Sequence, residues 1–288
     1  MTGPAPEVVA RVGATLGEGP IWIDHALWFV DIKAPCVYRF RPGDDGLRRW
    51  QAPSPVGWIL PDKTGLLAGL KTGVHRFDPV DGSFTDPIVI EPDLPGNRLN
   101  DATVGPDGTI WLGSMDDNES DASGGFYRLD RRGVIETGLP TAVVTNGPAI
   151  SPDGRTLYVT DTFAGLISAV PVGSDNTLGE PRPFITIAKE DGHPDGPTVD
   201  AEGCVWTGLF GGWGVRRYDP DGRLIATVRF PVANITKIAF GGPDLRIAYA
   251  TTARLALDAG ALAAQPLAGD LFAFDAGVAG LPTPRARI

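Results

Sequence analysis

The sequence contains little cysteine: of its 288 residues, only Cys36 and Cys204 are cysteines. Two cysteines make no disulfide framework, so we expect two buried free thiols and a reducing, cytoplasmic location. No apolar run is long enough to span a bilayer, and the N-terminus lacks the basic and apolar regions of a signal peptide. Positive charge is also scarce, since 35 acidic against 25 basic residues leave a net charge of −10. This balance argues against nucleic acid and membrane partners.

Helical signals are equally scarce, and the only helix that we expect is a short Ala-rich insertion over residues 258–264. Turn-forming residues are abundant instead, with 38 glycines and 27 prolines. An acidic turn followed by a short β-rich run recurs six times, at successive spacings of 38, 45, 46, 47 and 44 residues. These turns begin at Asp24, Asp62, Asp107, Asp153, Asp200 and Asp244. Two contain Asp-Gly, a hairpin signal because glycine readily adopts the positive φ of a tight turn.

A repeat of this length, with about four short strands in each unit, is typical of a β-propeller. Six copies in 288 residues allow 48 residues per blade (288/6). We therefore predict an all-β, six-bladed β-propeller that forms a single domain over residues 1–288. The segment at residues 7–12 precedes the first blade. We expect it to close the ring as the outer strand of the last blade, because closure protects exposed strand edges.

Three copies of a small pattern place an oxygen-bearing side chain before Gly-Pro: Glu18, Asn146 and Asp195. These residues and the pair Asn100–Asp101 lie five to seven positions ahead of the hairpin turn of their blades. The innermost strands of a propeller line its channel, so a shared offset puts these side chains at one level. Oxygen ligands from distant segments suit a hard divalent cation. An Asn or Asp before Gly is otherwise a plain turn residue, and the recurrence favours the metal site.

The chain resembles the gluconolactonase/regucalcin (senescence marker protein) family of six-bladed propellers over almost its full length. The motifs that carry this likeness are residues 16–22 (LGEGPIW), 29–32 (FVDI), 97–101 (NRLND), 145–148 (TNGP), 151–154 (SPDG), 194–196 (PDG), 200–203 (DAEG) and 240–244 (FGGPD). Residues 69–73 (GLKTG) and 251–254 (TTAR) are most similar to bacterial sugar lactonases such as xylonolactonase. The resemblance implies hydrolysis of a sugar lactone.

The resemblance also implies a set of site residues. It assigns one divalent cation to Glu18, Asn146 and Asp195, and substrate binding to Arg98 and Asn100. Likeness to xylonolactonase leans toward Fe²⁺, while Zn²⁺, Mn²⁺ and Ca²⁺ are also chemically suitable. Ligation by oxygen alone makes tightly held zinc less natural, because structural zinc prefers sulfur and nitrogen.

One acidic substrate contact of the family falls within residues 115–119, where the spacing of this chain departs from the family pattern. Asn118 occupies the directly matching position, and Glu119 or Asp117 replaces the family's acid. We assign Glu119 to substrate binding. His193, close to Asp195 in the sequence, is a metal ligand, part of the pocket wall or a loop histidine.

The predicted chemistry is the opening of a cyclic ester. A cation with open positions polarises the carbonyl and activates water. Asp195 and Asp101 are the candidate bases, with Asp195 favoured by the resemblance, and Arg98 and Asn100 can hydrogen-bond the hydroxyls. We predict a cytoplasmic, monomeric, metal-dependent aldonolactonase, acting on a pentonolactone such as xylonolactone or arabinonolactone.

Two other functions remain open from the sequence. A non-catalytic propeller that binds a divalent cation or a sugar is the first, since propellers host many functions. A pure cation binder has no need of Arg98, Asn100 and Asp101, so their presence favours the enzyme. The second is a metal-dependent esterase or phosphotriesterase, which a deep apolar pocket would favour.

Overall fold

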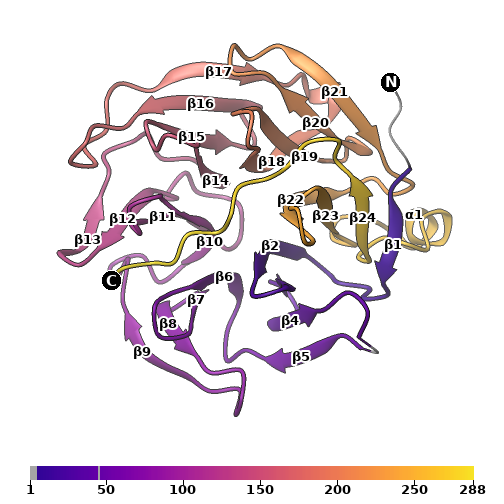
Figure 1. The fold of residues 1–288 in the computed structure, drawn as a ribbon, viewed down its shortest axis with the longest axis horizontal. Coiled ribbons are helices and arrows are strands. Elements are labelled where there is room, and N and C mark those ends of the chain that lie inside the picture. The colour runs from indigo at the N-terminus through magenta and orange to yellow at the C-terminus, as the bar shows by residue number, and fades with distance from the viewer. Residues whose placement is uncertain (1–4, 45) are drawn as a thin grey trace.

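The computed structural model describes residues 5–44 and 46–288, which form a ring of six antiparallel sheets (Figure 1). Each sheet has four strands that run in sequence order from the central channel to the outer edge, apart from the sheet that contains the N-terminal strand. The prediction of an all-β, six-bladed propeller is therefore confirmed.

The blades are numbered by their inner strands. Blade 1 contains β2 (Gly17–Ile23), β3 (Ala26–Asp31), β4 (Cys36–Phe40) and β5 (Arg48–Gln51). Blade 2 contains β6 (Val56–Pro61), β7 (Leu66–Leu70), β8 (Gly73–Phe77) and β9 (Phe84–Ile88). Blade 3 contains β10 (Asn97–Val104), β11 (Ile110–Asp116), β12 (Phe126–Asp130) and β13 (Gly133–Glu136).

The second half of the chain forms the other three blades. Blade 4 contains β14 (Thr145–Ile150), β15 (Thr156–Asp161), β16 (Leu166–Pro171) and β17 (Arg182–Thr186). Blade 5 contains β18 (His193–Val199), β19 (Val205–Phe210), β20 (Gly214–Tyr218) and β21 (Leu224–Arg229). Blade 6 contains β22 (Ile235–Gly241), β23 (Ile247–Thr252), β24 (Leu271–Asp275) and β1 (Glu7–Ala10).

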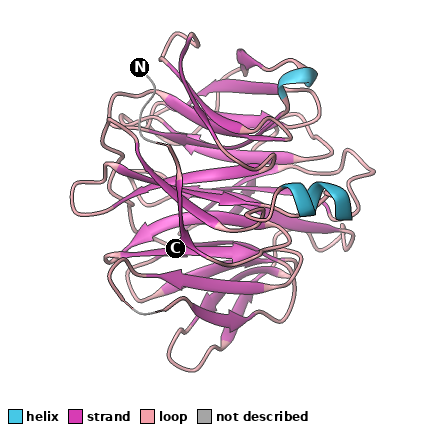
Figure 2. Cartoon of the chain, turned by 90° about the vertical axis from the view of Figure 1, so that its right-hand side faces the viewer, coloured by secondary structure: helices cyan, strands magenta, loops and turns pink. Residues whose placement is uncertain are grey.

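The ring is closed by the N-terminal strand, as predicted. β1 pairs antiparallel with β24, placing Glu7 opposite Ala273. The predicted helix is also present: α1 (Ala259–Ala264) begins after Asp258, whose side chain accepts a hydrogen bond from the Ala261 amide at 2.8 Å. A short 3₁₀ helix, η1 (Lys189–Asp191), precedes β18, and both helices lie on one face of the ring (Figure 2).

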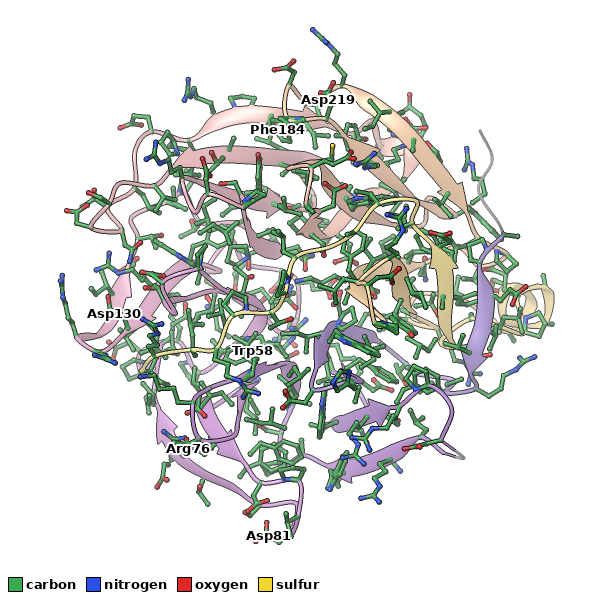
Figure 3. All side chains as sticks on the ribbon, in the orientation of Figure 1. Trp58, Arg76, Asp81, Asp130, Phe184 and Asp219 are labelled. Carbon is green, nitrogen blue, oxygen red and sulfur yellow. The ribbon has the colours of Figure 1, made fainter. Side chains whose placement is uncertain are left out.

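The apolar core is divided among the interfaces between blades. Six clusters of buried side chains each join two neighbouring sheets. Trp58, 1% exposed, lies toward the centre, whereas charged residues such as Asp81 and Asp219 lie at the outer edge (Figure 3). Cys36 and Cys204 are buried free thiols, as expected. Burial between sheets thus makes each blade depend on its neighbours for stability.

The C-terminal tail crosses the channel on the face that carries the hairpin turns between the first and second strands of the blades (Figure 1). Ala286 bridges to Asp62 and Gly280 bridges to Asp200, at two such turns. The opposite mouth of the channel, where the inner strands begin, is left to the predicted site. Neither helix in the described part of the chain has the length and apolar character needed to cross a membrane.

Candidate functional site

A break in strand pairing occurs at the same level of the inner strands. The register of β2 shifts between Glu18 and Ile21, and that of β14 between Asn146 and Ala149. β18 has the same irregularity around Asp195. Bulges re-aim side chains next to active sites.

Proline has no N–H to pair, which suits the unpaired positions of Pro20 and Pro148, whereas Pro197 lies opposite Thr207 where the pairing resumes. The same break occurs without Gly-Pro in β10, between Leu99 and Ala102, and in β22, between Ile235 and Ile238. The Gly-Pro pattern therefore accommodates a break that the inner strands share.

Close packing between the bulges requires glycine at specific points. Gly147 has φ of 73°, and a Cβ there would lie 2.9 Å from Cγ of Pro197 in the next blade. Gly19 has φ of 54°, and its Cβ would lie 2.6 Å from the Gly57 carbonyl oxygen. Only glycine combines this backbone conformation with so close a neighbour. The inner strands can therefore approach one another and bring their polar side chains together.

One cavity of about 430 Å³ collects the predicted residues. It is lined by Glu18, Arg98, Asn100, Asn146, Asp195, Glu119, Asn118, Asp117 and His193, among others. Asp101 does not line this cavity, and it is buried below it with 2% exposure. Blade 3 contributes most of the polar lining besides the three predicted ligands, and the apolar part of the lining includes Phe163, Phe210 and Leu255. The structure thus places most of the predicted site in one hollow at the channel mouth.

Glu18 and Asp195 form a buried carboxyl pair, close enough for a shared proton to join their side chains. Burial, followed by the charge of Asp101, raises the pKa of Glu18 to about 7. Burial, followed by the charge of Glu18, raises the pKa of Asp195 well above its ordinary value. Two carboxylates buried this close repel each other unless a proton or a cation lies between them.

Asn146 is held in place by a chain of hydrogen bonds. Its Oδ1 accepts from Nδ2 of Asn100 at 2.9 Å, and its Nδ2 donates to Oγ1 of Thr162 at 2.9 Å. Thr162 donates onward to the Pro194 carbonyl oxygen at 3.0 Å. The amide orientation is thereby set, and the Asn146 oxygen keeps its second lone pair free for a ligand.

Arg98 is buried and extends this series of hydrogen bonds beyond Asn100. Its Nη1 donates to Oδ1 of Asn100 at 2.5 Å, and its Nε donates to Oδ1 of Asp117 at 3.1 Å. Asp117 also pairs with Lys33 and Lys71, at 3.0 and 3.2 Å. Residues from blades 1, 2 and 3 therefore fix the guanidinium, while Glu119 lies exposed at the rim of the same cavity.

Asp101 is engaged in an ion pair. Both of its carboxylate oxygens accept from Nζ of Lys237 at 2.6 Å, and Oδ2 also accepts from the Gly147 amide at 3.0 Å. The amide of Ala102 donates to Oδ1 at 2.8 Å. Every strong acceptor position of Asp101 is thus occupied by a protein donor.

The chain matches the family described as the SMP-30/Gluconolactonase/LRE-like region over residues 16–254. It belongs to this family. Over 285 residues it is 36% identical to L-arabinolactonase of Azospirillum brasilense, covering 96% of this chain and 94% of the relative. Over 281 residues it is 31% identical to 6-deoxy-6-sulfogluconolactonase of Pseudomonas putida, covering 96% of each. Among solved structures, the calcium-binding protein regucalcin of Agrobacterium tumefaciens matches with a TM-score of 0.93 at 28% identity, covering 100% and 99%.

The donor set of this SMP-30/gluconolactonase family member fits a hard divalent cation. Glu18, Asn146 and Asp195 offer two carboxylates and an oriented amide oxygen, which are hard ligands. The buried carboxyl pair is the feature that a cation would relieve. Within residues 5–44 and 46–288, no group of three or more His, Cys, Asp and Glu residues forms a metal site. The proposed set contains only two such residues and relies on asparagine for the third oxygen.

The structure adds residues that the sequence reasoning missed. Lys237, Thr162, Lys33 and Lys71 all contact predicted site residues. The sequence does contain a signal for Lys237. It lies seven positions before the turn at Asp244, within the offset of five to seven positions that the other predicted site residues share. The register of β22 shifts at this point as well. His193 lines the cavity, with its Nδ1 3.3 Å from the Thr162 carbonyl oxygen.

We expect the metal-free protein to lose stability as the pH rises. The pKa of Glu18 is raised to about 7, and that of Asp195 is raised well above its ordinary value, mainly because both groups are buried. The folded state therefore retains protons that the unfolded chain has released, and stability falls from about pH 5 through pH 7 and above. Calorimetry of chelator-treated protein should show a Tm that is lower at pH 8 than at pH 5 by about 5 °C or more.

The matched control is the variant Glu18→Gln/Asp195→Asn, which removes both titrating groups and keeps their size. Its Tm should change less between pH 5 and 8 than that of the metal-free wild type. A wild-type Tm that rises with pH over this window, relative to the control, would contradict the raised pKa values.

Proposed function

We propose that this protein is a metal-dependent lactonase that opens an aldonolactone, most readily a pentonolactone such as xylonolactone or arabinonolactone. The observation that carries the proposal is the single cavity of about 430 Å³ in which Glu18, Asn146 and Asp195 meet Arg98. Lactone hydrolysis is the activity named for two relatives that match nearly the whole chain. The proposal includes the cytoplasmic location and monomeric state predicted from the sequence.

Glu18, Asn146 and Asp195 would hold one divalent cation, with Fe²⁺ preferred and Zn²⁺, Mn²⁺ or Ca²⁺ as the other candidates. When bound, the cation supplies Lewis acidity, polarising the lactone carbonyl and lowering the pKa of a nearby water. Only Glu18 and Asp195 contribute formal negative charge to this set. A cation held by only two carboxylates stays more electrophilic than one held by four or five carboxylates.

Asp195 takes the proton of the attacking water. The water oxygen forms a bond to the lactone carbonyl carbon, and the bond from that carbon to the ring oxygen breaks. Asp195 then returns the proton to the departing ring oxygen, which becomes a hydroxyl of the aldonic acid. One water is consumed and the carboxyl side chain is regenerated. Asp101 is the alternative base, but its oxygens already accept from Lys237 and the Gly147 amide.

Arg98, Asn100 and Glu119 bind the hydroxyl groups of the sugar. Arg98 presents a fixed guanidinium, and Asn100 Oδ1 has one lone pair left after it accepts from Arg98. Glu119, at the rim, is an acceptor for a hydroxyl at the far end of the ring. The polar edge formed by Arg98 and Asn100 suits a polyol and favours a sugar. The apolar side chains in the same lining, such as Phe163 and Phe210, are what the esterase or phosphotriesterase alternative would use.

The test is a panel of pentonolactones and hexonolactones, assayed by acid release above the spontaneous rate. Chelator-treated protein should be inactive and should recover when Fe²⁺ or Mn²⁺ is added. A pentonolactone should give the highest kcat/KM. No lactone hydrolysed above the spontaneous rate, with a metal and a sugar still bound, would favour the non-catalytic binding protein instead.

Arg98→Ala is expected to raise KM for the preferred lactone by about tenfold or more while changing kcat less. The reason is that Arg98 contacts hydroxyls in both the ground state and the transition state. Steady-state kinetics at saturating metal measure the two constants. Arg76→Ala is the control. Arg76 does not line the cavity, and it forms an ion pair with Asp62 at a distance of 2.8 Å. A large fall in kcat with KM unchanged would place Arg98 in transition-state stabilisation.

A further inference from the structure

The ion pair of Asp101 and Lys237 spans the channel. Asp101 belongs to β10 of blade 3 and Lys237 to β22 of blade 6, which are opposite blades in a ring of six. Nζ of Lys237 lies 2.6 Å from each Asp101 oxygen, and both side chains are buried. A buried ion pair is stable only when its charges are fully partnered. Its place across the channel therefore ties two distant blades together.

Both partners contact the backbone that follows a proposed metal ligand. Asp101 Oδ2 accepts a hydrogen bond at 3.0 Å from the amide of Gly147, the residue after Asn146. The Lys237 stem lies against Gly196, the residue after Asp195, where a Cβ would be 2.7 Å from Cδ of the lysine. The pair thus holds two of the three bulges that present ligands.

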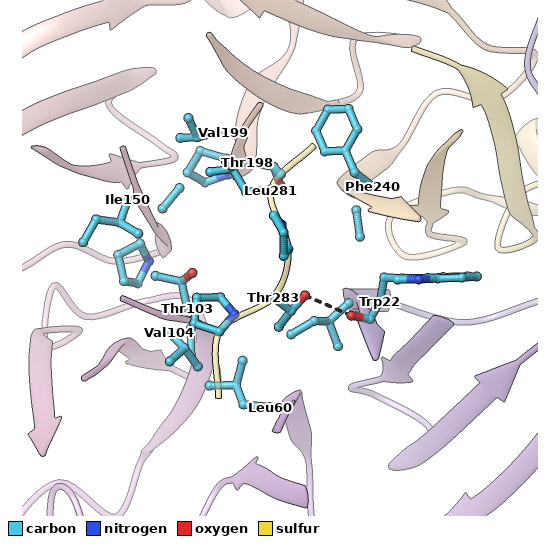
Figure 4. A pocket seen from close by; sticks show the side chains of 18 of the residues that line it. Trp22, Leu60, Thr103, Val104, Ile150, Thr198, Val199, Phe240, Leu281 and Thr283 are labelled. Carbon is cyan, nitrogen blue, oxygen red and sulfur yellow. Dashed lines mark hydrogen bonds between the residues drawn. The ribbon is translucent and has the colours of Figure 1, made fainter. Parts of the chain in front are cut away.

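The pair also separates two cavities. Above it lies the cavity of the candidate site. Below it lies a second cavity of about 420 Å³, lined by Lys237 and by tail residues such as Leu281. Thr283 of the tail closes this lower cavity by donating to the Trp22 carbonyl oxygen at 2.9 Å (Figure 4). Asp101 and Lys237 therefore lie in the layer between the two cavities, and neither lines the cavity of the candidate site.

The charges of the pair act on the proposed ligands. The negative charge of Asp101 acts on both Glu18 and Asp195, and the positive charge of Lys237 acts on Glu18. Without Lys237, three buried carboxylates would face one cation. With Lys237 present, the net charge of this group is −2, the charge of a single divalent cation with opposite sign.

We propose that Lys237 and Asp101, which pack against the ligand-bearing bulges, set the affinity of the site for its cation through their opposite charges. This inference rests on the proposed metal site of the lactonase and goes beyond it by assigning a role to Lys237. Removing either charge unbalances the site in opposite directions. Lys237→Met leaves an extra negative charge that attracts a cation, whereas Asp101→Asn leaves an extra positive charge that repels it.

The experiment measures Mn²⁺ binding to the full-length, chelator-treated protein by isothermal titration calorimetry. Lys237→Met should bind Mn²⁺ about tenfold or more tightly than wild type, and Asp101→Asn about tenfold or more weakly. The double variant Asp101→Asn/Lys237→Met, which buries no unpaired charge, should return to within about threefold of wild type. A purely structural role would weaken binding in all three variants and could not produce shifts of opposite sign.

The control is the exposed pair Asp221–Arg223, at 3.8 Å, whose variants Asp221→Asn and Arg223→Met should leave Mn²⁺ affinity unchanged. If Lys237→Met fails to fold, weaker binding by Asp101→Asn and its restoration in the double variant still decide the matter. Equal affinities in all variants, or weakening without restoration, would overturn the role of the pair. Wild type that binds no Mn²⁺ would overturn both proposals. Opposite shifts without lactone hydrolysis would overturn the proposed activity alone.

Discussion

Asp195→Asn is expected to lower kcat for lactone hydrolysis by about 10²–10⁴-fold at saturating metal. The asparagine keeps an oxygen that can face a cation, but it cannot accept the proton of the attacking water. Asp195 is buried next to Glu18 and lines the cavity, which would put it within reach of the proposed cation and the lactone. The substitution should therefore impair proton transfer more than it impairs binding of the cation or the lactone.

The measurement is kcat with the spontaneous hydrolysis rate subtracted, together with metal content and Tm. Asp191→Asn serves as the control, since Asp191 precedes the same inner strand and pairs with Arg216 at 3.0 Å on the surface. It should keep normal turnover. If Asp195→Asn kept near-full turnover with normal metal content while Asp101→Asn did not, the base would be Asp101.

Glu18→Gln is expected to weaken binding of the cation by at least about tenfold, because it removes one of only two formal negative charges in the ligand set. After dialysis against chelator and then a low concentration of Mn²⁺, the variant should contain little metal and show little activity. Excess metal should restore part of the turnover. Elemental analysis and activity measured on the same samples link the two losses.

Glu119→Gln is the matched control for this substitution, since Glu119 lies at the rim of the same cavity and carries the same charge. It should retain its metal and change only substrate affinity. Unchanged metal content and unchanged activity in Glu18→Gln would refute the assignment of Glu18 as a ligand.

The blades and most of the cavity residues could be predicted from the chain because the repeat is local. A hairpin turn determines where its own inner strand begins, so a constant offset identifies the residues at the channel mouth. The offset identifies Glu18, Asn100, Asn146 and Asp195, and the family resemblance adds Arg98 and Glu119. All six line one cavity. The same offset, counted back from the sixth turn at Asp244, also leads to Lys237.

The partners of these residues could not be predicted, because they depend on how separate blades face each other. Asp117 sits among Lys33, Lys71 and Arg98, which come from three blades. Nothing in the local pattern around Asp117 distinguishes it from Glu119 as the partner of Arg98. The path of the C-terminal tail across the channel is likewise a matter of tertiary contacts.

The sequence by itself determined the six blades and the level of the site, since strand, turn and bulge are set by neighbouring residues. Only the tertiary structure decided that Asp101 faces Lys237 across the channel, 136 positions away in the chain. From the sequence alone, Asp101 in the Asn100–Asp101 pair is equally consistent with a catalytic base and with a partner in a buried ion pair. The choice between these roles depends on which charge the opposite blade presents, and ring closure alone brings that charge into contact.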